Sequence, residues 1–395
     1  METNYSLDLA LIPKELKILL EIVNMKEGEQ IQTTDVERLD EINWNVFVNL
    51  ALHHRVYPLI CSKLKKLDHH FIPEKVCEFL YKKYKRNTFQ MLYLCSEMEH
   101  VNHICTENQI RLLFLKGPVL AFELYGDVSL RTSSDIDILI PIEQLGKMED
   151  MLIKSGYIKD DYIETILSDW KWRHHHLTYI HPEKNIKLEV HWRLNPGPGK
   201  EPNFAELWGR KRKSKLTSSP IYYLGKEDLF LFLVSHGARH GWSRLRWLLD
   251  IRQMVRQDLD WSKLCRLLKK YHCRHIGGQA LILASQLLNT ELNEEMEILI
   301  EGSKPKRLAQ EAVFYLEKMV NLHTDPVPDE VAAYHKRHLF SLMSFQQKFL
   351  FTMSLLYPYP SDAETLPLPK ALHFLYFPLR PFLWVLRKTR KHALS

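Results

Sequence analysis

Apolar residues recur at three- and four-residue intervals through the first 110 residues, a spacing that is typical of amphipathic helices. The pattern is clear in SLDLALIPKELKILLEIVN and WNVFVNLALHHRVYPLICSKLKKL. It continues without interruption in EKVCEFLYKKYKRNTFQMLYLCSEMEHVNHICTENQ. We therefore expect an N-terminal helical region over residues 1–110, in which this last segment forms one long helix.

The pattern changes after residue 110 to short apolar runs bounded by glycine and proline. Two buried strands are predicted in IRLLFLKG and DIDILIP. Between them, PVLAFELYG predicts a helix with Pro118 in its first turn and Gly126 at its end. A further helix is predicted in IEQLGKMEDMLIKSGY, and a hairpin in HHLTYIHPEKNIKLEVHWRL with its turn around residues 182–185. Residues 111–200 are therefore expected to form a small α/β core.

Helical spacing returns at residue 225, most clearly in KEDLFLFLVSHGARHGWSRLRWLLDIRQMVRQ, and predicts a C-terminal helical domain over residues 225–395. Before it, the basic cluster at residues 210–215 is interpreted as a solvated loop, with reception of an anionic acceptor as the alternative. The final aromatic and basic stretch contains Pro378 and Pro381, which argue against a helix. The fold class that follows is α+β.

Composition and charge exclude several classes of protein. Of the 395 residues, 45% are hydrophobic and 26% charged, as in soluble globular proteins. A net charge of +6 permits an anionic ligand but does not indicate a dedicated DNA-binding face. The six cysteines are scattered without a CxxC pair, which favours free thiols in a reducing compartment, so a cytoplasmic location is expected. Neither a signal peptide nor a transmembrane run is recognisable.

Two aspartates, Asp135 and Asp137, lie one residue apart in a strand that should be buried. Alternate residues of a strand share a face, so the two carboxylates point the same way and repel each other unless a cation lies between them. Lys187, Glu189 and His191 likewise share one face of a later strand. If the two strands are neighbours, Glu189 completes a cluster of three acids.

Three carboxylates that hold divalent metal beside a phosphate are typical of two-metal phosphoryl and nucleotidyl transfer. Mg²⁺ is the expected ion, because it takes a few carboxylates together with phosphate oxygens, and Mn²⁺ is the alternative. Lys116 and Gly117 precede a helix N-terminus, and Arg131, Ser133 and Ser134 precede the aspartates. We predict that these five residues bind the nucleotide phosphates.

The segment LKGPVLAFELYGDVSLRTSSDIDILI resembles the core of the nucleotidyltransferase superfamily that includes DNA polymerase β: an apolar strand, a glycine turn, a spacer and Asp-x-Asp, with a third acid on a later strand. The chain resembles the bacterial "uncharacterised nucleotidyltransferase" family over residues 40–260, where HRVYPLI and HGARHGWSRLRWLLDI are similar to its flanking motifs.

This resemblance implies a small mixed-sheet nucleotidyltransferase core flanked by helical regions. It implies transfer of NMP from an NTP, such as ATP, to an unidentified hydroxyl acceptor on a small molecule, peptide, protein or RNA. Asp135 and Asp137 would then bind metal, and Glu189 would be the third acid. Lys116 and Gly117 stand where the superfamily has Gly-Gly or Gly-Ser, a departure that leaves the mode of phosphate binding open.

A polar stripe is predicted on the helix that follows. Its members fall at three- and four-residue steps: His236, Arg239, His240, Ser243, Trp247 and Asp250. The stripe, together with His191, is expected to contact nucleotide or acceptor. The alternative is a buried polar network between two domains.

Several other interpretations stay open. A zinc site at His174, His175, His176 and His181 is disfavoured, because adjacent histidines should not all converge on one metal. A sugar-nucleotide glycosyltransferase with an Asp-x-Asp motif ranks low, because the first 110 residues look helical. A non-catalytic nucleotide- or partner-binding protein on the same scaffold is the main alternative. The aromatic and basic tail either packs on its own domain or contacts a membrane surface.

Overall fold

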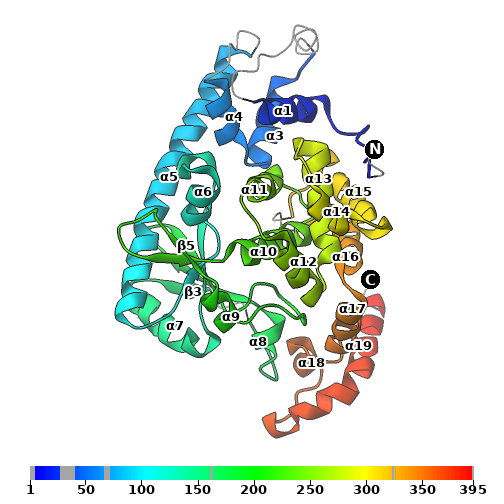
Figure 1. Cartoon of the computed structure of the whole chain (residues 1–395). Helices are drawn as coiled ribbons and strands as arrows, with labels where there is room; N and C mark the ends of the chain where they lie inside the picture. The colour runs from blue at the N-terminus through cyan, green and yellow to red at the C-terminus, as the bar shows by residue number, and fades with distance from the viewer. Residues whose placement is uncertain are drawn as a thin grey trace.

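In the computed structural model, helical segments precede and follow a mixed sheet along the chain (Figure 1). The structure describes residues 5–26, 41–65, 72–160, 163–322, 324 and 326–393. The α+β class expected from the sequence is confirmed, since helical segments precede and follow the sheet.

Among the residues that the structure describes, four N-terminal helices precede the sheet. They are α1 (Lys14–Asn24), α3 (Trp44–His53), α4 (Tyr57–Leu64) and α5 (Glu74–Glu107). The predicted long helix is confirmed, because α5 extends over 34 residues. In Figure 1 it runs along one side of the molecule, from the N-terminal helices to the sheet.

The sheet has seven strands in the order β3-β4-β5-β2-β1-β7-β6. They are β1 (Leu113–Phe114), β2 (Asp135–Leu139), β3 (Ile158–Asp160), β4 (His176–His181), β5 (Ile186–His191), β6 (Arg212–Ser214) and β7 (Ile221–Tyr223). The pairs β2–β5 and β1–β7 are parallel, and the other neighbours are antiparallel. The mixed sheet and the β4–β5 hairpin are therefore as expected.

The helices inserted between the strands are short. They are α6 (Pro118–Tyr125), α7 (Leu145–Lys154), α8 (Trp170–Arg173) and α9 (Phe204–Gly209), with 3₁₀ turns at Val128–Leu130 and Ile142–Gln144. Gly126 ends α6 in the left-handed conformation, with φ of 73°, as its place after the apolar run predicted.

The loop interpretation of the basic cluster at residues 210–215 is wrong, because Arg212–Ser214 form β6 and pair with β7. Alternation along a three-residue edge strand is too short to recognise in sequence. Both strands follow residue 200, where we expected the core to end, whereas α10 begins at Lys226. The division into three regions stays a prediction.

Helices make up the chain after the sheet. They are α10 (Lys226–Arg239), α11 (Leu245–Val255), α12 (Trp261–Lys270), α13 (Arg274–Leu288), α14 (Glu294–Ile300), α15 (Ser303–Glu317), α16 (Asp329–Leu342), α17 (Phe345–Ser354), α18 (Pro360–Thr365) and α19 (Tyr376–Ala393), with a 3₁₀ segment at Lys370–Leu375. The tail forms α19 although its two prolines weakened the prediction of a helix there. Pro378 falls in the first turn of α19, where no intrahelical bond is lost, and Pro381 is accommodated inside it.

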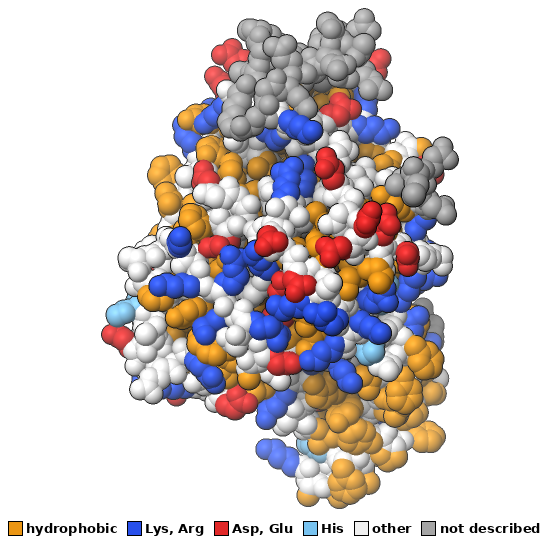
Figure 2. All heavy atoms as spheres, viewed as in Figure 1, with side chains coloured by type: hydrophobic (Ala, Val, Ile, Leu, Met, Phe, Trp, Pro, Cys, Tyr) orange, Lys and Arg blue, Asp and Glu red, His pale blue; other side chains and the backbone are white. Residues whose placement is uncertain are grey.

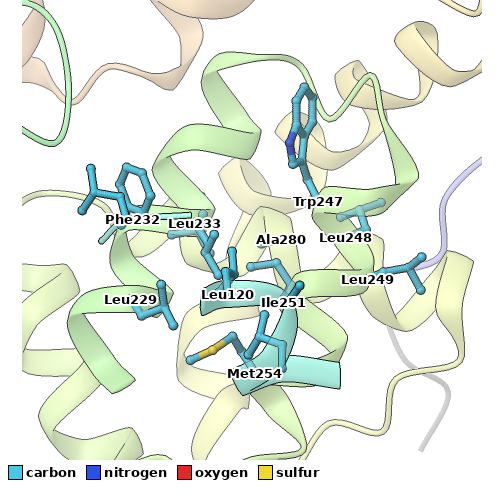
Figure 3. Close-up of a cluster of buried hydrophobic side chains, with 14 of the residues drawn as sticks. Leu120, Leu229, Phe232, Leu233, Trp247, Leu248, Leu249, Ile251, Met254 and Ala280 are labelled. Carbon is cyan, nitrogen blue, oxygen red and sulfur yellow. The ribbon is translucent and has the colours of Figure 1, made fainter. Parts of the chain in front are cut away.

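Buried apolar side chains join the core to the C-terminal helices (Figure 3). Leu120 of α6 packs in one cluster with Phe232 of α10, Ile251 of α11 and Ala280 of α13, all of which are almost fully buried. Burial of this apolar surface holds α10 and α11 against the core, beside the strands that carry the candidate acids.

The remaining expectations concern free cysteine thiols and contact with a membrane. All six cysteines are free. No helix within the described part of the chain has both the length and the apolar character needed to cross a membrane. Exposed apolar side chains gather over α17–α19, at the lower right of Figure 2, and Phe345 and Phe382 are 87% and 73% exposed. Contact of this tail with a membrane surface stays a prediction.

Candidate active site

The two strands that carry the predicted acids lie side by side. In the parallel pair β2–β5, Asp137 is opposite Glu189, Asp135 is opposite Lys187, and Leu139 is opposite His191. This register brings the polar faces of both strands to one place. The neighbour relation on which the three-acid cluster depended is therefore confirmed.

Asp137 is the most buried member of the cluster. Its Oδ1 lies 2.8 Å from Lys116 Nζ and 3.3 Å from His191 Nε2. Its Oδ2 is buried without a hydrogen-bond partner among the residues that the structure describes. Glu189 extends its Oε1 to 2.6 Å from Lys187 Nζ and its Oε2 to 3.5 Å from the same His191 nitrogen. The ionised forms of both carboxylates are thus stabilised by nearby positive charge.

The pKa values of the three acids diverge. Burial raises the pKa of Asp135, and the neighbouring charge of Asp137 raises it further. Burial also acts to raise the pKa of Asp137, but the Lys116 ammonium and the His191 hydrogen bond outweigh it and lower this pKa. The pKa of Glu189 is lowered as well, because hydrogen bonding and charge from His191 outweigh its burial. Asp135 is therefore the acid that holds a proton most readily.

The predicted phosphate-binding residues surround the acids. Gly117 caps α6 with φ of 74°, a conformation that favours glycine, and this turn directs Lys116 at Asp137. Ser133 Oγ donates to the backbone oxygen of Asp135 at 3.2 Å and lies 3.3 Å from its Oδ1. Ser134 lines the same cavity. The positive end of the α6 dipole is thus next to the acids.

Arg131 has a partner that the sequence did not reveal. Its guanidinium binds Asp250 of α11 in a bidentate pair, with Nε to Oδ1 and Nη2 to Oδ2 both at 2.9 Å. The Tyr125 hydroxyl donates to the same Oδ1 at 2.8 Å. The Arg131 and Asp250 side chains are 1% and 0% exposed. Arg131 lines the cavity, but its charge is already paired.

The single helical face predicted from residue 236 to residue 250 is wrong. The chain turns between α10 and α11, where Gly241 and Trp242 have φ of 61° and 53°. A Cβ on Gly241 would lie 2.5 Å from the Tyr315 ring, so this turn needs glycine. The residues of the stripe that nevertheless line the cavity with the acids are His236, Arg239, His240 and Trp247. The rings of His236 and His240 are 4.6 Å apart, centroid to centroid.

One cavity of about 660 Å³ contains the acids. Three arginines that sequence reasoning missed also line it: Arg55, Arg244 and Arg246. Arg246 Nη1 donates to Thr132 Oγ1 at 2.9 Å, and burial, together with the charges of Arg131 and Arg55, lowers the pKa of Arg246 to about 9. All three occur in the flanking motifs HRVYPLI and HGARHGWSRLRWLLDI, so the motifs were the available signal.

The four histidines do not all converge on one place, as expected, but two adjacent ones lie together. His175 and His176 have ring centroids 4.4 Å apart, and together with His191 each offers a nitrogen within 4.8 Å of the others. The reason is local: the carbonyl oxygen of His175 accepts from both Trp192 and Arg193, so the strand is irregular before β4 begins. The other two members of the predicted set, His174 and His181, are not in this group.

The donor set fits a divalent cation. Asp137, Glu189 and His191 each offer one ligand atom within 4.8 Å of the others, and the orphaned Asp137 Oδ2 is a further acceptor. A buried carboxylate oxygen without a donor is costly unless a cation satisfies it. Asp135 lines the same cavity but belongs to neither group of ligand atoms found among the described residues.

A mixed sheet with Asp-x-Asp on one strand and a third acid on its parallel neighbour defines a nucleotidyltransferase type of core. Residues 40–289 match the model of the uncharacterised nucleotidyltransferase family, and the chain belongs to this family. The match confirms the resemblance seen in the sequence and extends it beyond residue 260. Comparisons with curated proteins and with solved structures gave no match. Family membership supports nucleotidyl transfer as the general activity.

Proposed function

We propose that this chain is a metal-dependent nucleotidyltransferase that moves NMP from an NTP to a hydroxyl group of an acceptor. The observation that carries the proposal is the pairing of Asp137 with Glu189 across parallel strands, beside Asp135, in a cavity with strong positive charge. Seven lysine and arginine residues line that cavity: Arg55, Lys116, Arg131, Lys187, Arg239, Arg244 and Arg246. Apart from Arg131, whose charge Asp250 already pairs, these cations suit a triphosphate, which carries several negative charges.

The acids have different roles in this proposal. Asp137 and Glu189 would hold the divalent ion, which neutralises charge on the phosphates when it is bound. Asp135 lines the same cavity but lies outside the groups of ligand atoms, so we assign it to accept the proton of the acceptor hydroxyl. The acceptor oxygen then bonds to the α-phosphorus, the bond from that phosphorus to the bridging oxygen breaks, and pyrophosphate leaves.

The cations complete the arrangement. Lys116 neutralises Asp137 in the absence of a ligand and is close enough to turn to a phosphate oxygen. Arg246 and Arg55 add charge on the side of Ser133 and Ser134. The family match favours nucleotidyl transfer over the glycosyltransferase alternative. Whether the scaffold instead binds nucleotide without turnover is decided by experiment.

The test is thermal stabilisation by each of the four NTPs, with and without Mg²⁺ or Mn²⁺. A ligand that binds only the native state stabilises it by about 2.7 kcal/mol at a concentration of 100 times its Kd. We expect a metal-dependent rise in melting temperature for the wild type that disappears in the Asp135→Asn, Asp137→Asn double variant. Asp160→Asn, an exposed carboxylate of β3, is the matched control and should retain the shift.

Release of pyrophosphate then separates catalysis from binding. A metal-dependent shift without pyrophosphate release from any candidate acceptor would support the non-catalytic alternative. Equal shifts in the wild type and the double variant would mean that the acids do not hold the ion, and the proposed site would be wrong.

A further inference from the structure

His191 occupies an unusual position between two carboxylates. Its Nε2 lies 3.3 Å from Asp137 Oδ1 and 3.5 Å from Glu189 Oε2. Its other nitrogen, Nδ1, is buried and has no hydrogen-bond partner within the described chain. A buried histidine that serves only the fold normally makes at least one short hydrogen bond.

The contact of His191 with Asp137 at 3.3 Å is a long hydrogen bond, and both separations also suit two ligands of a shared metal ion. Hydrogen bonds from N–H to oxygen cluster at about 2.9–3.0 Å, so both contacts are long. Two ligands that each lie about 2.0–2.2 Å from one ion stand about 2.8–3.6 Å apart for angles between octahedral and tetrahedral. The two measured separations, 3.3 and 3.5 Å, fall in this second range.

Ring nitrogens of His175 and His176 lie near the same group of ligand atoms. His176 Nδ1 lies 3.2 Å from His175 Nε2, and His176 Nε2 lies 4.0 Å from Glu189 Oε2. The group of His175, His176 and His191 therefore shares His191 with the group of Asp137, Glu189 and His191. Imidazole nitrogens thus border the carboxylates on one side of the cavity.

We propose that His191 is a direct nitrogen ligand of the divalent ion held by Asp137 and Glu189, with His176 as an additional nitrogen beside it, so that the site selects a transition-metal ion over Mg²⁺. The inference rests on the proposed function, because the ion is the same one. Mg²⁺ favours oxygen ligands. Imidazole binds Co²⁺ and Zn²⁺ more strongly than Mn²⁺, and it binds all three of these ions more strongly than Mg²⁺. His191, interpreted from sequence as a contact of nucleotide or acceptor, becomes a metal ligand.

The decisive experiment is pulsed electron paramagnetic resonance of Mn²⁺ bound to the full-length protein without nucleotide. A directly bound imidazole couples its ¹⁴N nucleus to the Mn²⁺ electron spin, and labelling of all histidines with ¹⁵N must change that coupling. We expect the coupling in the wild type and a weaker coupling in His191→Gln, where only the additional nitrogen of His176 remains. The Kd of Mn²⁺ should rise about tenfold or more in this variant, whereas that of Mg²⁺ should change much less.

His174→Gln is the matched control, because His174 adjoins the pair on the chain but lies outside both groups. It should retain the ¹⁴N coupling and the wild-type Kd, and His176→Gln should weaken Mn²⁺ binding by a smaller factor than His191→Gln. If His191→Gln fails to fold, nitrogen coupling that persists in His176→Gln still assigns the imidazole to His191, and its absence there contradicts the assignment.

The result that would overturn the inference is Mn²⁺ bound without nitrogen coupling, or an equal Kd in wild type and His191→Gln. Either result leaves the proposed function intact as long as the metal-dependent NTP shift persists. Loss of that shift in the wild type, by contrast, would overturn the proposed function itself, so the two failures are distinguishable.

Discussion

The buried pair of Arg131 and Asp250 gives the sharpest prediction about stability. The side chains are 1% and 0% exposed and form two hydrogen bonds of 2.9 Å. Asp250→Asn preserves the shape of the side chain but removes its charge and presents an amide N–H to a guanidinium N–H. Arg131 is then a buried cation without a counter-charge, close enough to Arg246 for repulsion.

The expected cost follows from that geometry. Breaking a buried ion pair by changing one partner costs about 3–5 kcal/mol, because the remaining charge stays desolvated. Replacement of both partners, in Arg131→Met with Asp250→Leu, should recover most of this loss, although the Tyr125 hydroxyl then lacks its acceptor at 2.8 Å. The exposed pair of Lys14 and Glu41 is the comparison, since its side chains are 52% and 77% exposed.

The assay is equilibrium urea unfolding followed by tryptophan fluorescence, which the buried Trp242 and Trp247 beside α11 should report. Glu41→Gln should lower the free energy of unfolding by less than about 1 kcal/mol. If Asp250→Asn also stays within about 1 kcal/mol of the wild type, the guanidinium is hydrated and the reasoning from burial is refuted.

Three further predictions concern other parts of the chain. Glu189→Gln should lower turnover about a hundredfold while changing nucleotide affinity by less than about threefold, measured as pyrophosphate release and NTP binding. Turnover equal to that of the wild type would place the third acid elsewhere. Burial lowers the pKa of the His275 imidazole in the folded chain to about 4 from 6.5, so the unfolded chain takes up the imidazole proton first as pH falls. The free energy of unfolding should therefore be highest above pH 6.5 and decline towards pH 4. In His275→Gln the dependence of unfolding free energy on pH should be shallower by at most about 1.4 kcal/mol per pH unit, and an unchanged slope would contradict the assignment. Gly278→Ala places a Cβ 2.0 Å from the Leu299 carbonyl oxygen and should cost about 1–3 kcal/mol in urea unfolding, whereas Gly146→Ala, which meets nothing within 4 Å, should cost nothing.

Periodicity was sufficient to predict the parts of the fold that depend on local pattern. The 34-residue helix α5 and the common face of Asp135 and Asp137 follow from spacings of three, four or two residues, and the turn at Gly117 from a glycine that ends an apolar run. The position of Glu189 opposite Asp137 needed one further assumption, that β2 and β5 are neighbours, and the register confirms it.

The parts that sequence reasoning missed depend on contacts between distant segments. Arg131 and Asp250 are 119 positions apart, and nothing in either neighbourhood marks them as partners. Arg55 reaches the cavity from the turn between α3 and α4, so its role depends on tertiary packing. The approach of His175 to His176 depends on a local irregularity before β4, which period-two reasoning treats as absent.

The arrangement of cations has a consequence for synthesis of the chain. Arg55, Lys116 and Arg246 come from the N-terminal helices, the core and the C-terminal helices in turn. On the ribosome, where N-terminal segments emerge first, the sheet strands β1 to β5 are made before Asp250 exists to pair with Arg131. A nascent chain that stops before α11 would therefore lack the partner of Arg131 as well as Arg246 and Trp247 of the cavity, and nucleotide capture would become a property only of the finished chain.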